Sequence, residues 1–195
     1  MHSLVLYIEV THSNYEFKKG EFPEHYILED EFLCQHINDC DYARGNVFDS
    51  TEEGNFFKEV YLNDLKQAFD ESSHFNFVQN KDSLSIQISI DELKNWDKRV
   101  IELNEIYNEG LKFMIDNDYK INSRTTLPNG ETYYEYKDKV LSDVGGIRFV
   151  LYVEGELFGV MSEKELFNYI RESYLLWNET ESFEIAQNMI GDYHY

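Results

Sequence analysis

The chain is poor in basic residues, cysteine and proline, and it contains no long apolar run. Its 195 residues include only 17 Lys and Arg, 2 Cys and 2 Pro. Two cysteines are too few for a disulfide framework, which agrees with a reducing compartment. The start of the chain, MHSLVLYIEV, has no basic region and no small-residue cleavage site, so we predict neither a signal peptide nor a membrane span. These absences favour a cytoplasmic protein.

Acidic residues dominate the charge. The 38 Asp and Glu give a formal net charge of −21, and residues 1–71 hold 16 acids against 5 bases. Without a basic patch to displace counterions from phosphates, direct binding to nucleic acid is disfavoured, and so is binding to an anionic membrane. The same field attracts cationic protein surfaces. A purely solubilising role for the carboxylates is the alternative interpretation.

The apolar content is sufficient for a folded core, since 42% of the residues are hydrophobic and 16% are aromatic. We predict a single composite domain over residues 1–195, and the charge profile allows an acidic N-terminal subdomain over 1–71. Alternation of apolar residues predicts a strand at 3–10 that is covered on both faces and lies inside the sheet. The same criterion predicts two hairpins, 75–79 with 84–90 and 147–153 with 156–161, the second turning at Glu154-Gly155.

Helices are predicted between these hairpins. Ser89 with Glu92 and Ser162 with Glu165 have capping-box spacing. The first box opens a helix of about 25 residues over 91–115, and the second opens a helix with Leu166, Ile170, Tyr174 and Trp177 on one side. Further helices are expected at 25–38 and 55–69, whereas 178–195 suits either a helix or a strand. The fold class is therefore α+β: a mostly antiparallel sheet built from hairpins, with four to five helices including one long helix.

The long helix at 91–115 has a second interpretation. Its apolar residues repeat at three and four residues, as in a coiled-coil seam, so a homodimer through 91–115 is an alternative to packing in the core of one chain. Additional apolar residues widen the stripe beyond a narrow seam, which favours the core.

The stretch LEDEFLCQHINDCDYARGN, residues 28–46, contains both cysteines among five acids. Cys34, His36 and Cys40 are ligand types found in zinc sites, but their spacing matches no zinc finger or ribbon. Residues two apart on a helix point in different directions, so Cys34 and His36 would not share a metal. We predict no metal and no cofactor, and we interpret Cys34 as a small buried hydrophobic residue.

Catalytic signatures are also missing. The sequence has no G-x-S-x-G, H-E-x-x-H or paired C-x-x-C pattern. Glu135 and Lys137, with Asp116 and Asp118 upstream, have the order of a magnesium-dependent nuclease site. Such arrangements arise readily in a chain this rich in charge, and we favour a surface ion pair. A small enzyme with a site assembled from distant residues stays an alternative.

These observations favour a non-enzymatic inhibitor whose carboxylates imitate the phosphates of nucleic acid and block a basic nucleic-acid-processing enzyme. In composition alone, the chain resembles phage-encoded inhibitors of host defence, such as anti-CRISPR and anti-restriction proteins. An immunity protein against a basic toxin would need the same charge and is the alternative. Tyrosines near acidic stretches add interface area at low entropic cost. The predicted partner-binding residues are Glu29, Asp30, Glu31, Asp39, Asp41, Asp49, Glu52, Glu53, Tyr26 and Tyr42.

Overall fold

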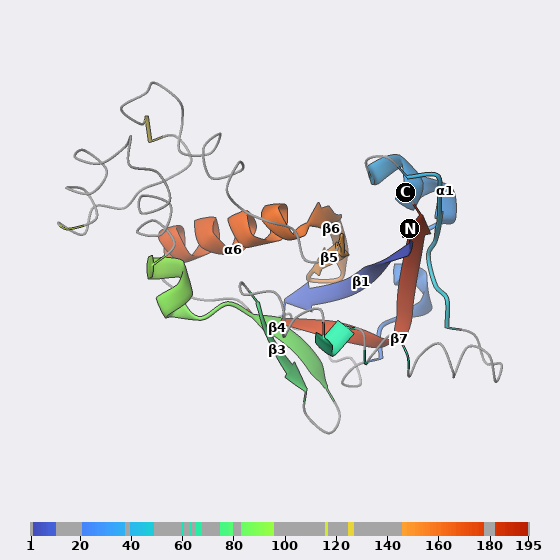
Figure 1. Ribbon diagram of the computed structural model, residues 1–195, viewed down its shortest axis with the longest axis horizontal. Helices are drawn as coiled ribbons and strands as arrows, with labels where there is room; N and C mark the ends of the chain where they lie inside the picture. Colours follow the sequence, from blue (N-terminus) through green and yellow to red (C-terminus); the bar gives the residue numbers. More distant parts are fainter. Residues whose placement is uncertain are drawn as a thin grey trace.

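The structure is a computed structural model. It describes residues 2–10, 21–37, 40–48, 60, 63, 65–67, 75–79, 83–95, 116, 125–126, 146–177 and 182–194. The described residues form a seven-stranded sheet with helical segments packed on both of its faces (Figure 1).

The sheet is mixed but mostly antiparallel, which confirms the predicted fold class. Its strand order is β3-β4-β7-β1-β5-β6, and β2 pairs with β7 beyond this path. Among the strand pairs of the described residues, only β1 and β5 are parallel. The strands are β1 (His2–Val10), β2 (Tyr42–Arg44), β3 (Asn76–Gln79), β4 (Leu84–Gln87), β5 (Arg148–Val153), β6 (Glu156–Ser162) and β7 (Ser182–His194).

β1 is central and is buried on both faces, as its sequence predicts. It lies between β5 and β7, and its side chains alternate between two cores. Leu6 and Ile8 belong to the core under helix α6, whereas Val5 and Tyr7 belong to the core on the opposite face. A strand covered on both faces carries apolar residues at consecutive positions, and this explains the run LVLYI.

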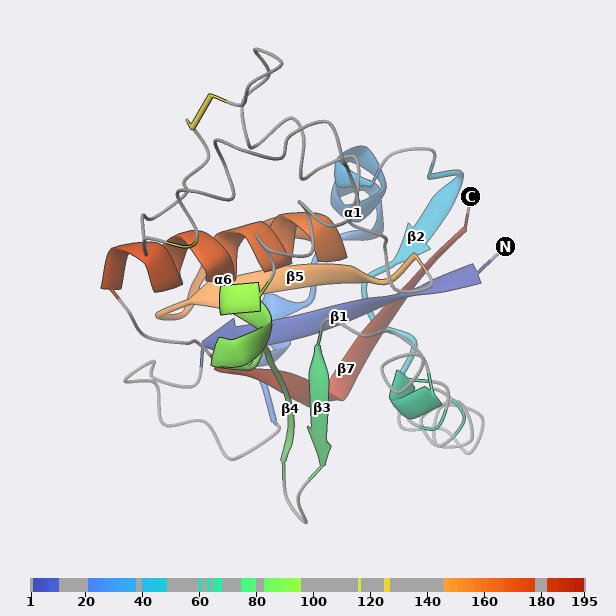
Figure 2. The same ribbon diagram turned by 60° about the vertical axis from the view of Figure 1, so that its left-hand side comes forward.

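Helix α6 (Glu163–Trp177) covers the first face and runs beside β5 (Figure 2). The predicted capping box is present: the Ser162 backbone N–H donates to Glu165 Oε2 at 2.7 Å, and the Glu165 N–H donates to Ser162 Oγ at 3.4 Å. Ile170 is buried against the sheet, but Trp177 is 74% exposed. The predicted apolar stripe therefore fails at its last position, because α6 ends there.

The second face is covered by a layer of short elements. The 3-10 helix η1 (Glu24–Tyr26) and helix α1 (Asp30–His36) replace the single helix predicted over 25–38. The helix is interrupted because Ile27 and Glu29 have extended backbone conformations. Leu33 and Ile37 are nevertheless buried, and together with Tyr26 they pack against β1 and β5.

The ambiguous segment 178–195 contains a strand, β7, which is the longest of the strands that the structure describes. β7 pairs with β1 along its length, so residues near the two ends of the chain lie side by side, with His2 opposite His194. The register shifts between Leu6, which faces Ile190, and Ile8, which faces Ile185. Within this bulge, Asn188 accepts a hydrogen bond from the Phe22 N–H at 2.8 Å and donates one to the Phe22 carbonyl at 2.7 Å.

Both predicted hairpins form, β3 with β4 and β5 with β6. Glu154 and Gly155 at the second turn have φ values of 51° and 82°, as a two-residue turn of this type requires. The first hairpin ends earlier than predicted: β4 stops at Gln87, and Ile90 is 44% exposed.

Residues 90–95 are helical, and the Glu92 N–H donates to Ser89 Oγ at 3.0 Å, so the predicted cap is present. Leu93 is buried in the core of its own chain. Residues 96–115 lie outside the described residues, and so does most of 55–69, where Leu65 is helical and buried.

Alkaline pH should destabilise the fold through Tyr152. Burial raises the pKa of this residue to about 12, against about 10 in an unfolded chain. The folded state holds the Tyr152 proton more tightly than the unfolded chain does. The contribution of Tyr152 to the free energy of unfolding is therefore complete below about pH 10 and is lost as the pH rises through about 12. We expect the free energy of unfolding, measured in urea at stepped pH, to fall over this interval.

The variant that tests this assignment is Tyr152→Phe. It removes the titrating hydroxyl, together with the hydrogen bond that Tyr152 Oη donates to the Tyr26 carbonyl at 2.8 Å. Its stability should be lower by about 1 kcal/mol at neutral pH but should fall less steeply between about pH 10 and 12. An equal slope in the wild type and the variant would contradict this assignment.

Candidate functional site

The layer formed by η1, α1 and β2 holds most of the predicted binding residues, and a buried tyrosine positions it. The Tyr7 hydroxyl donates to the Gly45 carbonyl at 2.6 Å and accepts from the Leu28 N–H at 3.2 Å. Asp30 Oδ1 accepts from the Gly45 N–H at 2.7 Å. Burial raises the pKa of Tyr7 above its usual value, so the hydroxyl keeps its proton. These bonds tie the start of α1 to the segment after β2.

These hydrogen bonds depend on a close approach between the backbone at Gly45 and the segment before α1. A Cβ atom at this position would lie 1.9 Å from the Leu28 carbonyl oxygen and 3.1 Å from Ile27 Cγ2. Glycine is therefore the residue that lets the segment after β2 touch the segment before α1.

Exposed carboxylates are concentrated in this layer. Three of them are the predicted binding residues Glu29, Asp30 and Glu31, at the N-terminal end of α1. Asp41, just before β2, is also exposed. We refer to the exposed acids of residues 21–48 as the acidic layer; it consists of Glu21, Glu24, Glu29, Asp30, Glu31 and Asp41.

The acidic layer contains two acids that sequence reasoning missed. Glu21 and Glu24 lie at and before η1, upstream of the stretch 28–46 on which the prediction concentrated. Only their proximity in sequence to Glu29 could have indicated them. Asp30 differs from the other acids because its bond to Gly45 gives it a structural role as well.

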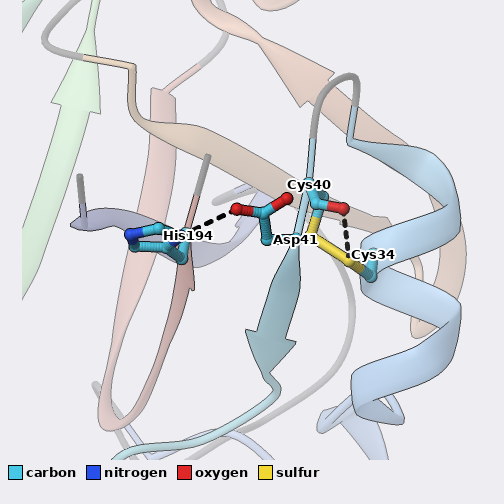
Figure 3. A network of polar contacts seen from close by, with 4 residues as sticks. All are labelled: Cys34, Cys40, Asp41 and His194. Carbon is cyan, nitrogen blue, oxygen red and sulfur yellow. Dashed lines mark hydrogen bonds and ion pairs between the residues drawn. A yellow bond between two sulfur atoms is a disulfide. The ribbon is translucent and has the colours of Figure 1, made fainter.

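Tyr42 is placed as predicted, on the surface beside Asp41. It is 43% exposed, and its ring stacks on His194 with centroids 5.5 Å apart and planes 7° apart. His194 Nδ1 lies 3.2 Å from Asp41 Oδ2, and the Asp41 N–H donates to the His194 carbonyl at 2.8 Å (Figure 3). His194, which pattern reasoning did not select, thus partly neutralises Asp41 whenever its imidazole is protonated.

Tyr26 is not a surface residue, so its prediction as a partner-binding residue is wrong. It is 1% exposed, and its ring stacks on Tyr152 at a centroid distance of 3.7 Å. Phe22 contacts it edge to face at 5.8 Å. Its acidic neighbours in sequence suggested exposure, but the 3-10 turn directs the ring into the second core.

The interpretation of Cys34 as a small hydrophobic residue is also corrected. Cys34 and Cys40 form a disulfide with Cα atoms 5.3 Å apart, and Cys34 is half-buried rather than buried (Figure 3). Bridged sulfurs carry no thiolate to donate to a zinc ion. In the described part of the chain, no group of three or more His, Cys, Asp or Glu side chains is arranged to hold a metal.

The remaining predicted residues, Asp39, Asp49, Glu52 and Glu53, lie outside the described residues. The same holds for Asp118, Glu135 and Lys137, whereas Asp116 is helical and exposed. Over the described ranges, no helix combines the length and the apolar character needed to cross a membrane.

The chain matches no protein-family model, and neither curated proteins nor solved structures show a significant similarity to it.

Proposed function

We propose that the chain is a non-enzymatic inhibitor that uses the acidic layer to occupy the nucleic-acid channel of a basic enzyme in the cytoplasm. The carboxylates take the place of phosphates, which proteins contact without reading base sequence. An inhibitor of this kind would suit a phage that has to block a host defence nuclease, as anti-CRISPR and anti-restriction proteins do.

One observation carries the proposal. Among the described residues of 21–48, six acids are exposed, and Arg44 is the only Lys or Arg. The acids lie on one covering layer, rather than on a loose tail. Tyr7 of β1 bonds to Gly45 of this layer, and Asp30 joins α1 to the same Gly45. A fixed set of charges of one sign attracts an opposite surface and speeds its association at low salt. Electrostatic repulsion among so many carboxylates destabilises the fold, and this cost favours a binding role for them over a purely solubilising one.

Affinity capture tests the proposal. The immobilised chain is exposed at low salt to a lysate of host cells that has been digested with nuclease, and bound proteins are eluted with rising salt and identified by mass spectrometry. We expect a basic nucleic-acid-processing enzyme to elute as the salt rises, because counter-ions screen an exposed charged interface. A basic toxin in the same fractions would instead support the immunity protein. No salt-released basic protein at all would contradict the proposal.

A further inference from the structure

α1 is too short to be stable by itself. It has seven residues, and its N-cap residue Glu29 makes no side-chain capping bond. Isolated helices below about 12 residues are marginal in water. The position of α1 therefore depends on its tertiary anchors: the buried Leu33 and Ile37, the bond from Gly45 to Asp30, and the disulfide at Cys34.

The disulfide is the covalent member of this set, and it joins two parts of the layer. Cys34 lies within α1, directly after the buried Leu33. Cys40 precedes Asp41, which is bonded to His194 of β7 (Figure 3). The bridge thus fastens α1 to the strand pair β2 and β7. Both cysteines are half-buried rather than buried, so a reductant in solution has access to the disulfide.

We propose that Cys34 and Cys40 form a redox-controlled clasp that fixes α1 and, with it, the acidic layer. In the opening reaction a dithiol reductant supplies two electrons and two protons. The S–S bond breaks, two thiols form, and the reductant becomes a disulfide. In a reducing compartment the dithiol form is the resting state, and a disulfide oxidant closes the clasp: it takes two electrons and two protons from Cys34 and Cys40 and leaves as a dithiol.

Opening the clasp should loosen α1 without unfolding the chain. The hydrophobic anchors remain, and Cys34 Sγ lies 3.2 Å from the Cys40 carbonyl oxygen, where a reduced thiol can donate a weak hydrogen bond. The native arrangement therefore stays the most populated one, but local opening of α1 becomes more frequent. The closed form holds Glu29, Asp30 and Glu31 in place and so avoids the entropic cost of ordering them on binding.

Hydrogen exchange tests the clasp directly. Exchange is compared in the oxidised chain, in the chain reduced with dithiothreitol, and in the Cys34→Ser/Cys40→Ser variant. We expect about tenfold faster exchange at residues 33–37 after reduction and unchanged exchange in β5. The variant should match the reduced chain with or without dithiothreitol. Equal exchange in the oxidised and reduced chains would overturn the clasp.

The effect on binding rests on the proposed function and is measured separately, with polylysine as the basic probe. We expect the oxidised chain to bind polylysine about fivefold more tightly than the reduced chain or the variant. If the oxidised and reduced chains bind polylysine with equal affinity, the disulfide does not control binding by the acidic layer, and this part of the proposal is overturned. Failure of every form to bind polylysine would count against the proposed function, and hydrogen exchange would then decide the clasp alone.

Discussion

Gly45→Ala should destabilise the fold by about 3 kcal/mol or more, because the added methyl group has nowhere to go. Its Cβ would lie 1.9 Å from the carbonyl oxygen of Leu28, which is backbone and cannot turn away as a side chain can. Relief of this clash requires the chain before α1 to move away from Gly45. Such a movement would strain the hydrogen bonds that Gly45 makes with Tyr7 and Asp30.

Gly159→Ala is the matched control. Gly159 lies in β6, and no atom comes within 4 Å of a Cβ built there. Alanine at this position should therefore leave the free energy of unfolding within about 1 kcal/mol of the wild type. Urea unfolding of the two variants at neutral pH provides the comparison. Equal stability of the two glycine variants would show that Gly45 does not hold the acidic layer in place.

Reversing Glu29 and Glu31 to lysine should weaken binding to the captured basic partner by about tenfold at low salt. The dependence of affinity on salt should also become flatter, since fewer favourable charge contacts remain to be screened. Asp30 is left unchanged because its carboxylate also accepts the bond from Gly45, so its replacement would mix structural and electrostatic effects. Thermal unfolding of the variant verifies that α1 tolerates lysine at its N-terminal end.

The control for net charge is the pair Glu154→Lys and Glu156→Lys. Both residues are exposed on the β5–β6 hairpin and do not belong to the acidic layer, and their reversal changes the net charge by the same four units. We expect this variant to keep most of its affinity for the basic partner, because the affinity depends on where the carboxylates lie as well as on the net charge. Equal losses in the two variants would mean that only the overall field matters.

Local patterns predicted much of the fold correctly. The alternation in β1, the two hairpins, the cap at Ser89 and the capping box at Ser162 all appear where the sequence places them. These features depend on contacts within a few residues or on a strand covered on both faces. Burial of Leu166 and Ile170 followed in the same way from helical spacing.

The errors arose where distant contacts decide the structure. β7 was ambiguous because its sequence is interrupted by a bulge, and Asn188 bonds there to Phe22, far away in the sequence. Tyr26 is buried because it stacks on Tyr152, which no local pattern indicates. The disulfide joins Cys34 within α1 to Cys40 beyond the end of α1 at His36, and helical spacing does not indicate such a pair.

The surface position of part of the site could be predicted. Glu29, Asp30, Glu31, Asp41 and Tyr42 are exposed, since charge and surface position go together. Their role in binding a partner stays a prediction. The contribution of His194 could not be predicted, because it depends on the pairing of β2 with the end of β7.

Imitation of phosphates is tested most directly by a displacement titration between the chain and nucleic acid on the captured enzyme. The apparent Kd of the chain is measured while the concentration of the enzyme's own DNA or guide RNA is raised. If the acidic layer occupies the nucleic-acid channel, the apparent Kd should rise in proportion to the competitor, and no ternary complex should form. A ternary complex in which the chain binds with unchanged Kd would contradict the account.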